Sequence, residues 1–161
     1  MIYSTILSKL KVIAEAHNSV AIGNVVELGD PEFMDSHIRN LSGKIVIIGD
    51  PNSNYGGNDS QGYEHITIVF AVIDTAAIGN WATIKTVRDA CKNIGEDICR
   101  AIRINAVPFV DHGSQRFTYF EMAETESQVI SNIFDDKTGY EFSIKLREPF
   151  SFAYDASKFT F

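Results

Sequence analysis

The sequence predicts an α+β domain with a largely antiparallel sheet and two amphipathic helices packed on one face. Three observations lead to this prediction. The expected elements follow in the order helix, strands, helix, strands; the turn-forming segment Asp135–Gly139 joins two alternating segments; and no repeat, linker or low-complexity tract divides the chain. With 161 residues, 45% of them hydrophobic, residues 1–161 can bury the core of one domain.

The N-terminal segment is the first predicted helix. Apolar residues recur at helical spacing over residues 2–17, with Ile6 and Leu10 on one stripe. The stretch that follows, Val20–Asn40, has no clear period. Only the turn at Gly29-Asp30-Pro31 can be predicted within it.

The middle of the chain holds two apolar segments separated by a polar one. Ile45–Ile48 predicts a short buried strand, and Asp50–Gly62, rich in Asn, Ser and Gly, predicts a long polar loop. His65–Asp74 predicts a longer strand that is apolar on both faces, and such a strand is covered on both sides. The protein's own helices would cover one face, and a neighbouring subunit is a candidate cover for the other.

Residues 81–103 show the clearest helical pattern. Their apolar stripe consists of Ile84, Val87, Cys91, Ile94, Ile98 and Ile102. Gly95 lies beside this stripe at a cost to the helix of about 1 kcal/mol, which the close approach of a strand would explain. Cys91 and Cys99 lie about 12 Å apart along the helix axis, too far for a disulfide. We expect both to be reduced core residues, in keeping with an intracellular compartment.

The last third of the chain predicts antiparallel strands. Phe117–Met122 is rich in aromatic residues, and Gln128–Phe134 alternates moderately. Tyr140–Leu146 alternates between apolar and polar residues, as a strand with one face in water does. Pro149 interrupts this pattern, so residues 149–161 are a candidate C-terminal extension.

The charge balance disfavours nucleic-acid binding. There are 21 acidic and 14 basic residues, a net charge of −7, whereas surfaces that grip a duplex are usually basic. We therefore expect no sequence-specific nucleic-acid binding. Residues 1–18 contain Lys9, Lys11 and Glu15 and no apolar run, so neither a secretory signal nor a membrane span is expected there, and no membrane partner.

Signals for cofactors and metals are weak. No glycine-rich phosphate-binding motif occurs. Asp50, Asn52 and Asn54 are spaced like the first ligands of a calcium loop, but Tyr55 stands where such a loop needs glycine, and Gln61 where it needs glutamate. We expect no cofactor and no metal.

Signals for catalysis are equally weak. The four histidines form no pair at metal-ligand spacing. Asp111, His112 and Ser114 contain the residue types of a hydrolytic triad, but residues so close in sequence rarely converge, and no nucleophile elbow surrounds the serine. We predict that the chain is not an enzyme and name no catalytic residue.

The distribution of apolar and aromatic residues favours a protein that works by self-assembly. A strand with two apolar faces, together with 11 Phe and 6 Tyr, favours an interface between subunits over a purely monomeric core. Tyr55 is the only aromatic residue of the predicted loop and a candidate contact anchor. We expect this loop to protrude from a rigid base, mobile in the free subunit and ordered in an assembly. The candidate interface residues are Asn54, Tyr55 and Asn58 in the loop and Val69, Ala71 and Ile73 on the strand.

The order of the elements resembles the tail-terminator family of long-tailed bacteriophages, also called tail-completion or minor tail proteins. The matching pieces are Ile2–Asn18, Ile45–Ile48, Asp50–Gly62, His65–Asp74, Trp81–Arg103 and Gln128–Leu146. The match spans most of the chain and consists of element order and length, because the family has no diagnostic motif.

The resemblance implies a homo-oligomeric ring, commonly six-fold, that caps the last ring of the tail tube and stops its growth. The implied partners are copies of the chain itself, the tail-tube protein and a head-side connector or neck protein. The implied location is the virion, after synthesis in the host cytoplasm, and the acidic charge would suit a lumen through which DNA slides.

Two other classes stay open at this point. The chain could be a monomeric or dimeric α+β module that binds a small ligand or a protein, or a small enzyme whose site the sequence does not reveal. The oligomeric state in solution separates the ring-forming protein from both.

Overall fold

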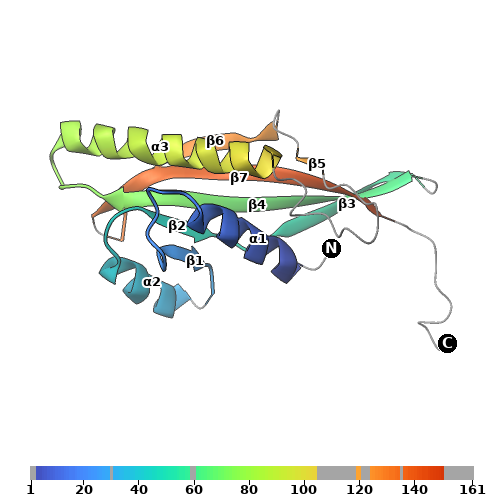
Figure 1. Ribbon diagram of the computed structural model, residues 1–161, viewed down its shortest axis with the longest axis horizontal. Helices are drawn as coiled ribbons and strands as arrows, with labels where there is room; N and C mark the ends of the chain where they lie inside the picture. The colour runs from blue at the N-terminus through green and yellow to red at the C-terminus, as the bar shows by residue number, and fades with distance from the viewer. Residues whose placement is uncertain are drawn as a thin grey trace.

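The computed structural model describes residues 3–29, 31–58, 61–104, 119–120, 124–134 and 136–150. These residues form three helices and one seven-stranded sheet (Figure 1). The helices are α1 (Tyr3–Glu15), α2 (Pro31–Asn40) and α3 (Trp81–Ile104). The strands are β1 (Val25–Glu27), β2 (Ile45–Ile48), β3 (Asn52–Asn58), β4 (Gln61–Thr75), β5 (Tyr119–Phe120), β6 (Glu126–Ile133) and β7 (Lys137–Phe150).

The sheet is built around the long antiparallel pair of β4 and β7. Strands β2 and β3 follow one another along the outer side of β4, and β6 and β5 both pair with the outer side of β7. Strand β1 extends the sheet beyond β2 and is parallel to it, whereas the other described pairings are antiparallel. The predicted α+β fold with a largely antiparallel sheet is therefore confirmed.

One face of the sheet carries the larger core, which α1 and α3 cover (Figure 1). Alternate residues of the central strands point to this face because side chains alternate along a strand. The cross-strand pairs that fill it are Ile66 with Leu146, Ile68 with Ile144, and Phe70 with Phe142. The predicted helices over residues 2–17 and 81–103 are both present, with small differences at their ends.

Helix α3 packs against Phe142 of β7 at Gly95. A side chain at this position would overlap the ring of Phe142, which itself stacks on Phe70 with 5.2 Å between ring centroids. The explanation predicted for Gly95, the close approach of a strand, is confirmed.

The opposite face of the sheet carries a second core, which the sequence did not predict. Helix α2 lies here, and its residues Met34 and Ile38 pack with Ala71 and Ile73 of β4. The stretch Val20–Asn40 thus contains both β1 and α2, a third helix on the second face. Helix α2 is only 10 residues long and mostly polar, so its few apolar residues gave too short a pattern to recognise.

A buried lysine joins this second core to the end of the sheet. Lys137 is only 2% exposed, and its Nζ donates hydrogen bonds to the carbonyl of Leu41, just after α2, at 3.2 Å, and to Oγ1 of Thr75 at 3.1 Å. An ion pair with Asp136 at 3.6 Å adds an opposite charge. The segment after α2 is therefore tied to β4 and β7 by polar contacts as well as by the apolar cluster.

The prediction that Asp50–Gly62 forms a polar loop is wrong. Most of it is strand β3, which pairs with β4 over seven register positions from Asn52–Thr67 to Asn58–Gln61. Asn, Ser and Gly have low β-propensity, so local sequence favours a loop. The unpaired side of β4 offers a hydrogen-bonding partner, and this tertiary pairing overrides the local preference.

The last third agrees with the prediction in its hairpin and differs at its ends. Strands β6 and β7 form the expected hairpin, but its turn comes earlier than predicted, because Lys137–Gly139 of the predicted turn Asp135–Gly139 already belong to β7. Strand β7 also continues through Pro149 to Phe150, so the predicted break at Pro149 is wrong. Beyond Arg147 the outer side of β7 pairs with no described strand, so a missing N–H is tolerated there. Residues 151–161 and most of the predicted strand Phe117–Met122, apart from β5, lie outside the described residues.

None of the described helices combines the length and the apolar composition needed to cross a membrane.

Candidate functional site

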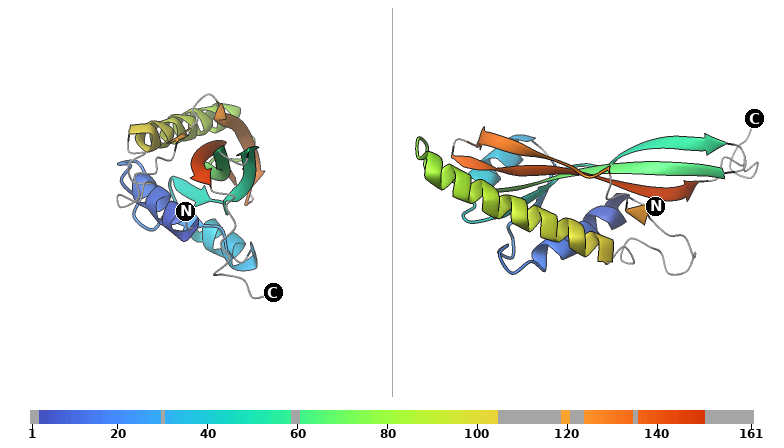
Figure 2. Two further views of the ribbon diagram at one scale, coloured as in Figure 1. Left: turned by 90° about the vertical axis from the view of Figure 1, so that its right-hand side faces the viewer. Right: turned by 90° about the horizontal axis from the view of Figure 1, so that it is seen from above.

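Among the described residues, the main protruding feature is an arm of three strands, with the short strand β5 beside its base at Leu146 and Arg147. We use this name for β3 together with the parts of β4 and β7 beside it, Gln61–Thr67 and Lys145–Phe150. The arm extends past the ends of α1 and α3 (Figures 1 and 2). We call the helix-covered remainder the body.

The arm is a continuation of the body's own strands. Strands β2 and β3 are separated only by Gly49–Pro51, and the N–H of Gly49 donates to the carbonyl of Val69 at 2.8 Å, which keeps this interruption beside β4. The two short strands and β4 thus form one long antiparallel ribbon. Its direction is set by the body, where the register is fixed by buried side chains.

One face of the arm carries an aromatic and cationic cluster. Tyr63 lies opposite Gly56 of β3, and its ring contacts the imidazole of His65 edge-on, with centroids 4.7 Å apart. The guanidinium carbon of Arg147 on β7 lies 4.1 Å from the centroid of the Tyr63 ring, a cation–π distance. None of these four residues was among the candidate interface residues that the sequence predicted. The only signal was that Tyr63 continues the alternation of the predicted strand His65–Asp74.

The opposite face of the arm presents Tyr55. Its side chain is 55% exposed, and its register partner on β4 is Glu64, which is 7% exposed. Asn54, the register partner of His65, lies on the same face as Tyr63 and is also exposed. Asn58 pairs with Gln61 at the far end of β3, and its side chain lies outside the described part of the molecule.

The candidate interface residues on β4 divide differently. Val69 is half-buried, but Ala71 and Ile73 are 8% and 0% exposed beneath α2. The expectation that a neighbouring subunit covers this part of the strand is therefore wrong. The chain covers it with its own second core, because the unassigned stretch folds into α2.

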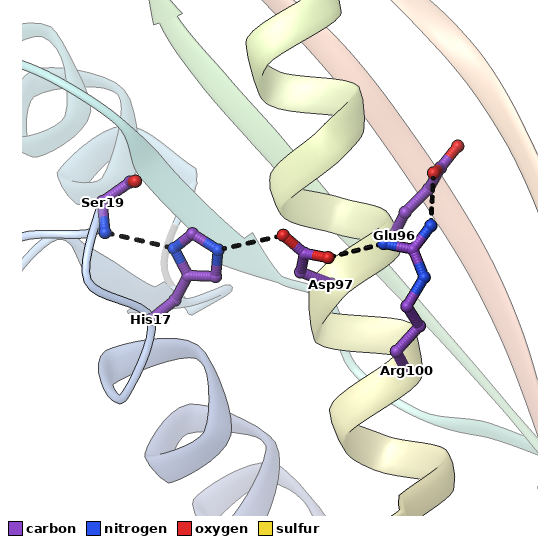
Figure 3. Close-up of polar contacts among 5 residues, drawn as sticks. All are labelled: His17, Ser19, Glu96, Asp97 and Arg100. Carbon is purple, nitrogen blue, oxygen red and sulfur yellow. Dashed lines mark hydrogen bonds and ion pairs between the residues drawn. The ribbon is translucent and has the colours of Figure 1, made fainter.

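A polar network joins the end of α1 to α3 (Figure 3). The Nε2 atom of His17 lies 3.5 Å from Oδ2 of Asp97, whose Oδ1 accepts a hydrogen bond from Arg100 at 2.5 Å. Arg100 also donates to Glu96 at 3.0 Å. Ser19 completes the residue types of a hydrolytic triad, but its backbone N–H donates to Nδ1 of His17 at 3.1 Å. The histidine thus contacts the serine's main chain and does not activate its hydroxyl, so the network ties two helices together.

The triad suggested by the sequence cannot be placed. Asp111, His112 and Ser114 all lie in the segment 105–118, outside the described residues.

The two cysteines are core residues. Cys91 and Cys99 are free thiols, 0% and 4% exposed. Burial raises the pKa of each to about 12, so the reactive thiolate is scarce at neutral pH. The prediction that both pack in the core is confirmed.

The calcium-like spacing does not form a loop. Asn52 and Asn54 are extended in β3, where they cannot wrap around an ion as ligands of a calcium loop do. No group of three His, Cys, Asp or Glu residues within the described ranges is placed to hold a metal.

A polar groove lies where β6 pairs with β7. Its volume is about 400 Å³, and its walls are Glu126, Ser127, Gln128, Glu141 and Ser143. A hydrogen bond of 2.6 Å from Gln128 to Glu141 spans the two strands. The two carboxylates, two hydroxyls and one amide of this lining could bind an uncharged or cationic ligand.

Comparison with known proteins adds no relative: no family model matches the chain, and no curated protein matches it.

Proposed function

We propose that this chain is a structural protein that works by assembling with copies of itself, in a ring of the phage tail-terminator kind. The observation that carries the proposal is the open edge of the arm. Strand β3 pairs with β4 on one side, and on its other side it pairs with no strand in the described part of the chain. Such an edge offers a row of backbone N–H and C=O groups to another chain.

The composition of this edge supports assembly. Natural edge strands are usually protected by charges, by proline or by shortness. Strand β1 is only three residues long and carries Glu27. Strand β3 is seven residues long, and its sequence, NSNYGGN, contains neither a charge nor a proline. A strand edge of this length and composition favours a partner strand.

A second open edge suggests which strand the partner supplies. Strand β6 lies on the other side of the sheet and pairs only with β7 among the described strands. Residues Glu126–Ser131, apart from the half-buried Ile130, are exposed. If β6 of one copy pairs with β3 of the next, the contact is head-to-tail, and head-to-tail contacts close into rings when the rotation allows.

The further features of the proposal come from the family resemblance. A ring of six copies would end the polymerisation of the tail tube and bind the tube protein on one side and the head-side connector on the other. The protein would then belong to the virion. The net charge of −7 is compatible with a lumen that repels DNA.

Cross-linking tests the proposal directly. Cys91 and Cys99 are buried, so the native chain offers little reactive thiol. One variant carries Asn54→Cys in β3 and Gln128→Cys in β6, and a matched control pairs Asn54→Cys with Asp89→Cys on the exposed side of α3. A short bifunctional maleimide should give a ladder of multimers with the first variant and little product with the control.

Two results would contradict the proposal. Dimers alone, formed equally by the single variant Asn54→Cys, would indicate symmetric pairing of two β3 edges. Monomers at every accessible concentration, also in the presence of tail tubes, would favour the alternative of a monomeric binding module, for which the groove between β6 and β7 is the candidate ligand site.

A further inference from the structure

Tyr63 contacts all three strands of the arm. It belongs to β4, lies opposite Gly56 of β3, and holds the Arg147 guanidinium of β7 4.1 Å from its ring centroid. His65, two residues further along β4, contacts the Tyr63 ring with its imidazole, and the two ring centroids are 4.7 Å apart. We call these four residues, Gly56, Tyr63, His65 and Arg147, the Tyr63 clamp.

Gly56 and Tyr63 are fitted to one another. A Cβ atom at position 56 would lie 2.6 Å from Cε2 and 2.9 Å from Cζ of the Tyr63 ring. The ring therefore occupies the space of the missing side chain and covers the glycine backbone. An aromatic residue placed across from a glycine in this way restores stability that the glycine costs a strand.

The arm needs such support because the larger core reaches only its base. The buried apolar residues of β4 and β7 end at Ile66 and Leu146. Among the described strands β3 pairs with β4 alone, and it contains Asn, Ser and Gly, which favour strands least. Backbone pairing without side-chain packing gives a ribbon of marginal stability.

We propose that Tyr63 is the positioning residue of the arm, which fixes β3 against β4 and β7 and so presents the open edge in one conformation before a partner binds. A strand held ready in this way loses less conformational entropy on association than a flexible one does. The effect on assembly rests on the proposed function, whereas the effect on the arm's order does not.

Hydrogen exchange of the isolated subunit tests the order of the arm. Tyr63→Ala should speed exchange of the β3 amides by about tenfold, the scale of one lost cation–π and ring contact, and leave α3 amides unchanged. Tyr63→Phe keeps the aromatic ring, so exchange of the β3 amides should stay as slow as in wild type. The matched control is Tyr55→Ala, which removes the exposed tyrosine of the opposite face and should leave β3 exchange within about twofold of wild type, as surface changes usually do.

A double-mutant cycle tests the fit between the ring and the glycine. Gly56→Val should also speed exchange, because its side chain collides with the ring. In the pair Gly56→Val with Tyr63→Ala, valine takes the vacant space and exchange should slow relative to either single variant. Unchanged β3 exchange in Tyr63→Ala, or additive effects in the pair, would overturn the proposal.

Assembly is measured separately. If wild type forms multimers, Tyr63→Ala should form them more slowly, and equal rates would contradict the positioning role. If wild type forms none, the proposed function fails, while the exchange experiment still decides whether the clamp orders the arm.

Discussion

The body and the arm share the strands β4 and β7 but are stabilised differently. In the body, Phe70 and Val72 of β4 are 1% and 0% exposed under α1 and α3. In the arm, Tyr63 and His65 lie on the other face of the same strand, the face that α2 covers further along at Ala71 and Ile73, and neither residue belongs to a core cluster. Burial of apolar area thus stabilises the body, whereas backbone pairing and one aromatic clamp hold the arm. The predictions below test this difference, from the largest expected effect to the smallest.

The largest loss should follow Phe142→Ala. Phe142 is 2% exposed, stacks on Phe70 and fills the space above Gly95. Removing its ring leaves a cavity in the body, and the free energy of unfolding should fall by about 3–5 kcal/mol. Urea denaturation followed by circular dichroism measures this, and a loss below about 1 kcal/mol would show that the ring is not part of a close-packed core.

A smaller loss should follow Lys137→Ala. The substitution leaves the carbonyl of Leu41 and the hydroxyl of Thr75 without their buried donor. The free energy of unfolding should therefore fall by about 2–3 kcal/mol. The matched control is Lys145→Ala, whose amine bonds Glu124 at the surface and whose loss should cost at most about 1 kcal/mol. Equal losses in the two variants would contradict the structural role of Lys137.

The buried thiols should make the body sensitive to alkali. The folded pKa of Cys91 and of Cys99 is about 12, above the ordinary thiol value. At pH values below that ordinary value, the thiols keep their protons in both the folded and the unfolded chain, so the free energy of unfolding does not depend on them. As the pH rises towards 12, the thiols of the unfolded chain ionise first, and the free energy of unfolding falls. The expected loss is about 1.4 kcal/mol per pH unit for each thiol.

The thiol contribution can be isolated by comparison with the variant Cys91→Ala with Cys99→Ala. Denaturation of both proteins at pH 8 and pH 10 should show a steeper decline for wild type. Parallel pH profiles would mean that the thiols are as accessible to ionisation when folded as when unfolded.

The smallest effect on stability should follow Tyr55→Ala in the arm. Tyr55 is 55% exposed, so the free energy of unfolding should change by no more than about 0.5 kcal/mol. If the arm joins subunits, the same variant should weaken multimer formation as judged by sedimentation velocity. Unaltered assembly would remove Tyr55 from the interface.

The sequence predicted the body far better than the arm. Phe70, Phe142 and the apolar stripe of α3 have clear periods because burial selects their spacing. The residues of β3 have no apolar period, since neither face of that strand is buried in a core, and their strand conformation depends on pairing with β4. Helix α2 was missed for a related reason, since among its residues whose burial is described Met34 and Ile38 alone are apolar and buried.

The candidate site could be predicted only in part. The segment that protrudes was named, with Asn54 and Tyr55 in it, because its polar composition excludes a buried core. Ala71 and Ile73 were misplaced because the helix covering them was not recognised. The Tyr63 clamp depends on a cross-strand register that no local pattern specifies.

The central claim, that the arm joins copies of this chain, is tested most directly by measuring the mass in solution of an arm-shortened variant. Residues 55–64 are replaced by an Asn-Gly turn between Asn54 and His65, which are register partners. Light scattering after size exclusion should give a multimer for wild type and a monomer for the variant, with the body's urea transition unchanged. A variant that folds and keeps the wild-type multimeric mass would contradict the account.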